Sequence, residues 1–304
     1  MSRPIVMVCG EPHRPYDRPP LSKEALSEAD LADTLSFRSA DWYEQKAVRL
    51  VLGVAARRLD QREQLVELSD GSSIPYAQLL IATGARPRRL EMFDRFENVS
   101  SLRTLEDAGT LRNALVPGAR LLVIGAGFVG QEAASAARKA GVHTTIVEAA
   151  ASPLASVLGT DLGGWFAQLH RASGVELLLG EQVVAVRGDG RVQAVAVASG
   201  RTIACDHVLV GVGVQPDLDW LQGSALHRTG VRTDLDGRTE IPEVYAAGDA
   251  AAIFDPQLDA HVPGNHWESA ARQGSRAAKA MLGLDPGPPS ISSFWSDLYG
   301  TRIQ

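Results

Sequence analysis

The chain has 304 residues, which is enough for two domains of ordinary size, each with its own core. Apolar residues make up 45% of it and charged residues 22%, which excludes a disordered or a collagen-like chain. With 30 basic and 36 acidic residues the net charge is −6. Like charges are not grouped in blocks, which argues against nucleic acid or an anionic membrane as the main partner.

The two cysteines, Cys9 and Cys205, are too far apart in the sequence for a C-x-x-C redox pair, and two cysteines form neither a disulfide framework nor a zinc site. We therefore predict no metal site and a reducing, cytoplasmic setting. The apolar run at the N-terminus is too short for a signal peptide, and no stretch reaches the ~18 apolar residues of a membrane span. Cys9 lies in an apolar strand and is expected to be a small core residue.

Taken in chain order, the first unusual stretch is residues 12–23, which are rich in proline and basic residues. Arg18 and Lys23 in this stretch could face a phosphate or a negatively charged ring system. Lysine is scarce, with four in the whole chain, which draws attention to Lys23. The alternative is an ordinary basic loop in solvent.

Residues 47–82 predict short strands of one α/β domain. The last of them, at 79–81, is buried and ends at a flexible turn that contains Thr83 and Gly84. A hydroxyl and a glycine at the end of such a strand can approach a ligand. An ordinary loop glycine is the alternative.

The central region is the clearest α/β unit. An apolar run at 119–124 predicts a buried parallel strand, and a glycine-rich turn leads from it into an alanine-rich helix at 131–140. The next strand, at 143–148, ends on Glu148. The remaining predicted elements are a helix, a strand, a three-stranded β-meander and a closing strand, at residues 161–173, 175–179, 183–186, 191–198, 202–204 and 208–210.

The glycine-rich turn has the dinucleotide-binding pattern G-x-G-x-x-G, formed by Gly125, Gly127 and Gly130. A strand precedes it, a helix follows it, and an acid lies about twenty residues on, which is the context the pattern requires. Phosphates would bind at the N-terminus of the helix, where unpaired N–H groups favour anions. Glu148 can bind the adenosine ribose and would repel a 2′-phosphate, so NADH is favoured over NADPH. A tight turn without a ligand is the alternative.

Residues 244–282 predict a second part of the domain that begins the chain. A strand at 244–247 leads to Asp249, and a helix ends near Leu282. A carboxylate at the end of a strand can face ligand hydroxyls outside the carboxyl edge of the sheet, although a simple turn aspartate is equally consistent with this motif alone. A proline-rich linker follows at 285–289.

Together these motifs resemble one family over essentially the whole chain. That family is the FAD-dependent and NADH-dependent ferredoxin reductases of putidaredoxin-reductase type, which supply electrons in bacterial cytochrome P450 and aromatic-ring dioxygenase systems. The PPLSK and FWSD segments are specific to this branch. The segments that carry the resemblance are PYDRPPLSK at 15–23, LLIATGARPR at 79–88, LRTLEDA at 102–108, VIGAGFVGQE at 123–132, GVGVQP at 211–216, VYAAGDAA at 244–251 and FWSDLYGTRIQ at 294–304.

The resemblance implies an α/β fold of two nested doubly wound domains. A FAD domain in two parts, 1–113 and 238–289, is interrupted by an NAD domain at 114–237, and residues 290–304 begin a C-terminal α+β interface domain. The implied function is transfer of a hydride from NADH to FAD, followed by transfer of single electrons to a [2Fe–2S] ferredoxin. The alternatives are an NADH oxidase, the reductase portion of another flavoenzyme, or a non-catalytic NAD-binding fragment.

The resemblance also implies roles for particular residues. Lys23, beside the isoalloxazine ring, and Glu132, beside the nicotinamide, are predicted to be the catalytic residues. Glu11 would hold the adenosine ribose of FAD, Asp249 its ribityl chain and Trp267 the flavin ring. The other predicted cofactor-binding residues are Arg18, Ala56, Thr83, Gly84, Arg103, Gly125, Gly127, Phe128, Val129, Gly130, Glu148 and Gly213.

The sequence departs from the family pattern at three places. A family member is expected to begin with a strand, a further G-x-G-x-x-G turn and a helix, about thirty residues in all. The C-terminal domain would also stop after its first strand, so we expect the chain to be a fragment. Asn265 and Ser152 stand where the family usually has a glutamate and an arginine. The relatives that use a cysteine beside the flavin place it near residues 21–31, where this sequence has none.

Overall fold

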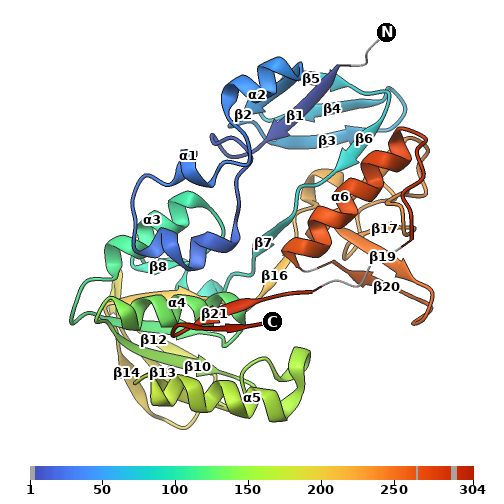
Figure 1. Cartoon of the computed structure of the whole chain (residues 1–304). Coiled ribbons are helices and arrows are strands. Elements are labelled where there is room, and N and C mark those ends of the chain that lie inside the picture. The colour runs from blue at the N-terminus through green and yellow to red at the C-terminus, as the bar shows by residue number, and fades with distance from the viewer. Residues whose placement is uncertain (1–3, 265, 289–292) are drawn as a thin grey trace. The chain divides into compact units, whose positions relative to one another are not determined.

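The computed structural model describes residues 4–264, 266–288 and 293–304, which form two compact units (Figure 1). The first unit is made from the described parts of Met1–Asp17, Ala32–Arg86 and Gln215–Phe294. The second is made from Arg18–Leu31, Pro87–Val214 and Trp295–Gln304. The domain boundaries predicted from the sequence, at residues 114, 238 and 290, stay predictions.

The second unit is built on a five-stranded parallel sheet. Its strands are ordered β11-β10-β9-β15-β8. From the central β9 the chain moves outward through β10 to β11 and then returns to place β15 on the other side of β9, beside β8, which comes before β9 in the sequence. This is the doubly wound α/β arrangement that the sequence predicts. The strands are β8 (Val99–Ser100), β9 (Arg120–Ile124), β10 (His143–Glu148), β11 (Glu176–Leu179) and β15 (His207–Val210).

Two different layers cover the faces of this sheet. Helix α4 (Phe128–Lys139) packs against β9 and β10, and α5 (Ala155–Ala172) packs against β11. Leu122 and Ile124 of β9 belong to an apolar cluster with Val195 of the β-meander. Because successive strand residues face opposite sides, the meander covers the face away from α4. The meander strands are β12 (Val183–Asp189), β13 (Arg191–Val197) and β14 (Thr202–Ala204).

The helices begin at places that the sequence pattern does not predict. Helix α4 starts at Phe128, three residues before the predicted start at 131, because Gly127 already serves as its N-cap. Helix α5 starts at Ala155 rather than at 161 and is broken at Gly159, whose φ of 79° and ψ of 175° are not helical. The predicted helix is therefore the part of α5 after this break.

The remaining elements of the second unit are short. Residues 18–31 form two 3₁₀ turns, Pro19–Ser22 and Glu24–Leu26, and Thr104 begins α3 with a capping box that pairs it with Asp107. The last described residues form a β-hairpin. The elements are α3 (Leu105–Ala114), β21 (Ser296–Leu298) and β22 (Thr301–Ile303).

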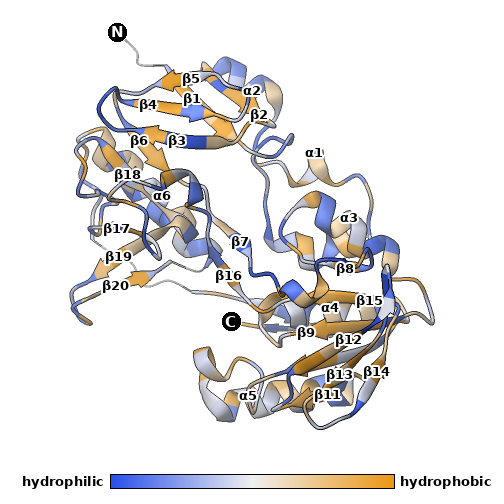
Figure 2. Ribbon diagram, turned by 180° about the vertical axis from the view of Figure 1, so that it is seen from behind, coloured by the Kyte–Doolittle hydropathy of each residue, from blue (hydrophilic) through white to orange (hydrophobic). Residues whose placement is uncertain are grey.

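The first unit contains several small sheets around one apolar cluster. Strands β1 and β2 pair in parallel, as do β6 and β18, and two three-stranded sheets have the orders β3-β4-β5 and β17-β19-β20. The cluster joins Leu59 and Val66 to Ile81, Val231 and Val244. In Figure 2, where apolar residues are orange, many of the strands are orange. The elements are β1 (Ile5–Cys9), α1 (Ala32–Leu35), α2 (Ala40–Gln45), β2 (Val48–Leu52), β3 (Ala56–Asp60), β4 (Leu65–Leu68), β5 (Ser73–Pro75), β6 (Leu79–Ile81), β17 (Val231–Thr233), β18 (Val244–Ala246), β19 (Ala251–Asp255), β20 (Ala260–Pro263) and α6 (Trp267–Met281).

The chain passes between the units through β7 (Ala85–Pro87) and β16 (Val214–Pro216), which pair with each other.

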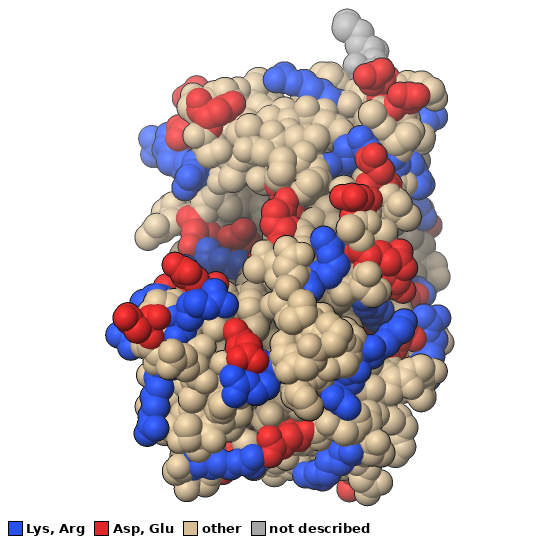
Figure 3. Space-filling model, turned by 90° about the vertical axis from the view of Figure 1, so that its left-hand side faces the viewer, with Lys and Arg blue, Asp and Glu red and all other residues tan. Residues whose placement is uncertain are grey.

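On the face drawn in Figure 3, acidic and basic side chains are interspersed. Many of the charged side chains form exposed ion pairs within a unit, such as Arg120 with Asp206 at 2.6 Å. Such pairs add little stability. Within the described residues, no helix has the length and apolar character needed to cross a membrane.

Candidate functional site

The turn between β9 and α4 is shaped by its glycines. Gly125 has a φ of 99°, and a Cβ at this position would collide with the carbonyl oxygen of Gly211. A Cβ on Gly130 would collide with the carbonyl oxygen of Gly125, so only glycine lets α4 start this close to the strand. Around Gly127 there is open space, and the only described neighbour within reach of a Cβ is the Gly211 carbonyl oxygen at 3.9 Å.

This turn fits a dinucleotide. Gly127 is the N-cap of α4 and offers no side-chain hydrogen bond to the first N–H groups of the helix. Those donors are left for another acceptor, and together with the helix dipole they favour a phosphate. The predicted residues Gly125, Gly127, Phe128, Val129 and Gly130 are thus brought together at one helix end.

Glu148 closes the turn from the neighbouring strand. Its carboxylate lies at the end of β10 and accepts hydrogen bonds from the N–H of Ala126, at 2.6 Å, and of Ala150, at 2.7 Å. Each carboxylate oxygen has further acceptor capacity, which a ribose hydroxyl could use. Glu148 therefore holds the glycine turn in shape, and its binding to the ribose stays a prediction.

A second polar cluster lies in the same unit, around Glu132 of α4. Glu132 is only 6% exposed, and the Lys23 ammonium lies 2.8 Å from its Oε2. The hydroxyl of Ser22 donates to Oε2 at 2.5 Å, and the hydroxyl of Ser296 donates to Oε1 at 2.8 Å. The two residues predicted to be catalytic are thus in direct contact. The alternative interpretation of Lys23 as part of a solvated basic loop is wrong, because its side chain is 15% exposed.

The segment that carries Lys23 is fixed from two sides. The Arg112 guanidinium of α3 donates to the carbonyl oxygens of Ala25, at 3.2 Å, and Glu28, at 2.8 Å. Arg18 donates to the carbonyl oxygen of Arg103 at 2.6 Å. Because these are charge-assisted bonds to backbone, they limit how far Lys23 can move. Arg18 and Arg103, both predicted to bind cofactor, therefore lie together.

The first unit carries the other predicted flavin-binding residues. Strands β6 and β18 run parallel, with Ile81 opposite Ala246, so Thr83, Gly84 and Asp249 all leave the same end of this pair. Glu11 follows β1 and accepts a hydrogen bond from the Tyr16 hydroxyl at 2.6 Å. Half-buried carboxylates at the carboxyl ends of parallel strands are suited to sugar and ribityl hydroxyls. These hydrogen-bond acceptors fit the hydroxyl-rich parts of FAD.

Thr83 and Gly84 also have a structural task. The Thr83 hydroxyl donates to the carbonyl oxygen of Asp217 at 2.7 Å, and the Asp217 N–H donates to the carbonyl oxygen of Gly84 at 3.0 Å. Two other predicted residues of the first unit lie at the starts of elements: Trp267 begins α6 and is 41% exposed, and Ala56 opens β3. In the second unit, the carbonyl oxygen of Gly213 accepts a hydrogen bond from the Arg88 N–H. Cofactor contacts of these five residues stay predictions.

The residues where the sequence departs from the family pattern differ in environment. Ser152 is 6% exposed, and its hydroxyl has no hydrogen-bond partner among the described residues. Asn265 lies outside the described residues.

The expectation that Cys9 is a core residue is wrong, because it is only half-buried in a strand whose Ile5 is 57% exposed. Cys205 is the buried cysteine, and burial raises the pKa of its thiol to about 11, which makes it a poor nucleophile.

Two groups of polar residues at the site could not be predicted from the sequence. The first is Ser22 and Ser296, which lie in the recognised PPLSK and FWSD segments but have no local signal for a shared partner. The second is a buried chain of hydrogen bonds. Gln131 donates through Nε2 to the carbonyl oxygen of Ala126 at 3.0 Å, so its Oε1 faces Nε2 of His170 at 2.8 Å.

This arrangement defines the protonation of His170. Its Nε2 must carry the proton that Gln131 accepts, and its Nδ1 then accepts from the Tyr299 hydroxyl at 2.6 Å. Burial lowers the pKa of His170 to about 4, which keeps the ring neutral at pH 7. The chain of bonds connects the C-terminal hairpin to the peptide of the nucleotide turn.

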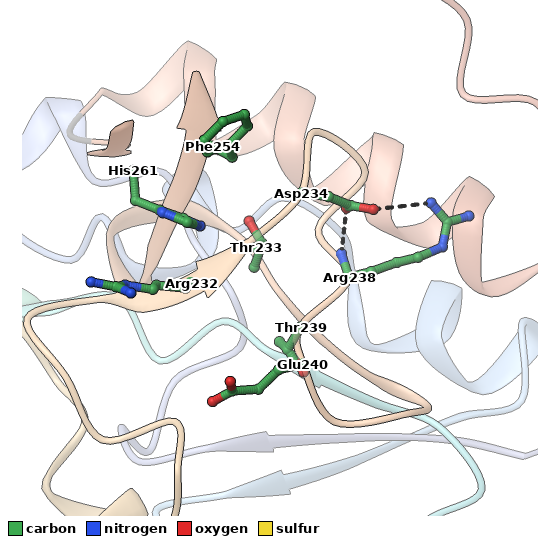
Figure 4. A pocket seen from close by; sticks show the side chains of 8 residues that line it. All are labelled: Arg232, Thr233, Asp234, Arg238, Thr239, Glu240, Phe254 and His261. Atoms are coloured by element: carbon green, nitrogen blue, oxygen red, sulfur yellow. Dashed lines mark hydrogen bonds and ion pairs between the residues drawn. The ribbon is translucent and has the colours of Figure 1, made fainter. Parts of the chain in front are cut away.

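None of the predicted site residues lines a depression of about 620 Å³ in the first unit (Figure 4). Arg238 on its rim lies 3.5 Å from the carboxylate of Asp234. Because charges of both signs line it, they favour no single class of ligand. The lining residues are Arg232, Thr233, Asp234, Arg238, Thr239, Glu240, Phe254 and His261.

Comparison with known proteins agrees with this geometry. Residues 2–274 match the family described as pyridine nucleotide-disulphide oxidoreductase. The chain is 35% identical over 303 residues to the ferredoxin–NAD(+) reductase component of the anthranilate 1,2-dioxygenase system of Burkholderia cepacia, with 99% of this chain and 75% of that protein covered. It is also 35% identical to rhodocoxin reductase of Rhodococcus erythropolis, over 99% of this chain and 71% of that protein.

Solved structures agree with the sequence relatives. The crystal structure of the covalent putidaredoxin reductase–putidaredoxin complex matches with a TM-score of 0.93 at 32% identity, over 97% of this chain and 73% of that chain. A ferredoxin reductase from Rhodopseudomonas palustris matches with a TM-score of 0.92 at 30% identity, over 98% of this chain and 74% of that chain.

Proposed function

Because the chain belongs to the pyridine nucleotide-disulphide oxidoreductase family and to its ferredoxin reductases, we propose that it accepts a hydride from NADH on FAD and passes electrons to a [2Fe–2S] ferredoxin. Relatives named as ferredoxin reductase components of dioxygenase systems support this acceptor. The ferredoxin would in turn serve a dioxygenase or a cytochrome P450. The use of NADH supports a cytoplasmic location.

One observation carries the proposal more than any other. A single helix, α4, provides both the nucleotide-binding N-terminus and, one turn later, the carboxylate of Glu132 that pairs with Lys23. A nicotinamide coenzyme anchored by its phosphates at this helix end would have its position set by the same rigid element that holds the ion pair.

Bound FAD supplies the conversion between a two-electron donor and a one-electron acceptor. The residues of the chain bind and orient. Glu148 would accept hydrogen bonds from the ribose hydroxyls of NADH, and the N–H groups at the start of α4 would bind the pyrophosphate of NADH. Lys23 holds a positive charge at a fixed place, because Glu132 and the neighbouring backbone restrict its movement, and a fixed cation favours an electron-rich ring beside it. Hydride transfer needs no acid or base, so Glu132 acts by position and charge.

The proposal is tested with the FAD-loaded chain, NADH and a purified [2Fe–2S] ferredoxin. The expected result is fast bleaching of the flavin absorbance by NADH and ferredoxin-dependent reduction of cytochrome c. Oxygen uptake is measured in parallel, since an NADH oxidase would consume NADH at the same rate with and without ferredoxin. NADH consumption that ferredoxin does not accelerate would refute the proposal.

A further inference from the structure

Three donors converge on one buried carboxylate. Lys23 and Ser22 both contact Oε2 of Glu132, at 2.8 Å and 2.5 Å. Ser296 contacts the other oxygen, Oε1, at 2.8 Å. Because the two oxygens are held by different partners, the plane of the carboxylate is fixed as well as its position. A carboxylate with only one oxygen held can rotate about the Cγ–Cδ bond.

Ser296 reaches Glu132 from a distant part of the sequence. It opens β21 and is 1% exposed, so its hydroxyl is shielded from water. The two residues are 164 positions apart. A buried hydroxyl needs a partner, and here the partner is the same carboxylate that pairs with Lys23.

The hairpin that carries Ser296 is attached to the unit by other contacts too. Leu298 is 1% exposed and packs in an apolar cluster with Leu154 and Phe166. The backbone N–H of Tyr299 donates to the Ser135 hydroxyl of α4 at 2.8 Å. The hairpin therefore does not depend on the Ser296 hydroxyl to stay in place, which allows its effect on Glu132 to be separated from its effect on folding.

We infer that Ser296 is a positioning residue for Glu132, and that it keeps the carboxylate oriented so that Lys23 stays at one place during the reaction with NADH. This inference rests on the proposed function for its kinetic consequence. The orientation of the carboxylate itself does not depend on that function.

The test compares the variants Ser296→Ala, Ser296→Thr and Ser135→Ala with the original chain. Ser135→Ala is the matched control, because it removes the other serine contact between α4 and the hairpin without touching Glu132. Stopped-flow mixing with NADH gives the limiting rate of flavin reduction and the apparent dissociation constant. The ¹³Cδ resonance of Glu132, identified by its loss in Glu132→Gln, is recorded in labelled protein with and without FAD.

We expect Ser296→Ala to lower the limiting rate about threefold to tenfold, because part of a charge-assisted hydrogen bond is lost, while the apparent dissociation constant for NADH changes little. It should also shift the Glu132 resonance. Ser296→Thr should restore both readouts, and Ser135→Ala should leave both close to their original values. If Ser296→Ala does not fold, Ser296→Cys replaces it as the weaker hydrogen-bond donor.

Two outcomes would overturn the inference. One is an unchanged Glu132 resonance in Ser296→Ala, and the other is an equal loss of rate in Ser135→Ala, which would mean that only the attachment of the hairpin matters. Failure of the original chain to reduce ferredoxin would count against the proposed function alone, because the resonance reports on the carboxylate independently.

Discussion

Replacing Glu148 by glutamine should change the coenzyme preference toward NADPH. The carboxylate accepts two backbone hydrogen bonds, from Ala126 at 2.6 Å and Ala150 at 2.7 Å, so its place beside the nucleotide turn is well defined. A 2′-phosphate bound at this strand end would lie within several ångströms of the negative charge. At the effective dielectric constant of a half-buried site, this repulsion is about 1 to 3 kcal/mol. The preference for NADH should therefore fall by about 5-fold to 150-fold.

The measurement is kcat/KM for NADH and for NADPH in the FAD-loaded chain. Two controls separate the charge from other effects. Glu148→Asp keeps the charge but is too short to retain both backbone bonds, so it should lower the thermal midpoint and keep the preference. Glu181→Gln removes a carboxylate that is bound to the Ser199 N–H at 3.1 Å and should change neither. An unaltered NADH-to-NADPH ratio in Glu148→Gln would refute the assignment of Glu148.

Three further outcomes are expected. Lys23→Met should lower the free energy of unfolding by about 3 kcal/mol in a denaturant titration, because it leaves Glu132 charged and buried. Adding Glu132→Gln should restore much of this loss, and fully additive effects of the two substitutions would contradict the prediction. Burial lowers the pKa of His170 from 6.5 to about 4, so the unfolded chain binds the proton first as the pH falls. Stability should therefore be lost between about pH 6.5 and pH 4, by about 3 kcal/mol for this residue, and His170→Gln should flatten that slope in unfolding measurements at pH 5 and 7.5. Gly130→Ala should weaken NADH binding at least about tenfold, because its Cβ meets a backbone carbonyl in the turn, whereas Gly164→Ala, where a Cβ meets nothing within 4 Å, should leave the dissociation constant unchanged.

Much of the second unit could be predicted from local sequence. Strand β10 has the predicted bounds, and β9 begins one residue later than predicted, because continuous apolar runs next to glycine turns have few other arrangements. The start of α5 could not be predicted, because Gly159 breaks the helix into two segments. The pattern of apolar residues indicates a helix only after this break, so the short segment before it was expected to be a loop. A break in a helix has a weaker signal than its regular part.

The candidate site was only partly predictable for a different reason. Family motifs point to Lys23 and Glu132 separately as catalytic residues, but their ion pair and the part played by Ser22 and Ser296 depend on contacts across more than a hundred residues of sequence. No spacing rule connects positions so far apart. Cys9 was predicted to be buried because its strand is apolar, but it is half-buried in the structure. An apolar strand is buried only when other layers cover both of its faces.

The interleaving of the two units has a consequence for synthesis on the ribosome. The second unit receives chain from residues 18–31, 87–214 and 295–304, and the first unit receives the stretches between. The strands of the sheet of β8 to β15 end at Val210, but the hairpin that belongs to the same unit is made only after residue 294. Domains that consist of one continuous segment can fold as they emerge. Here the contact of Ser296 with Glu132 joins residues that are 164 positions apart, and contacts of such long separation form late and slow folding.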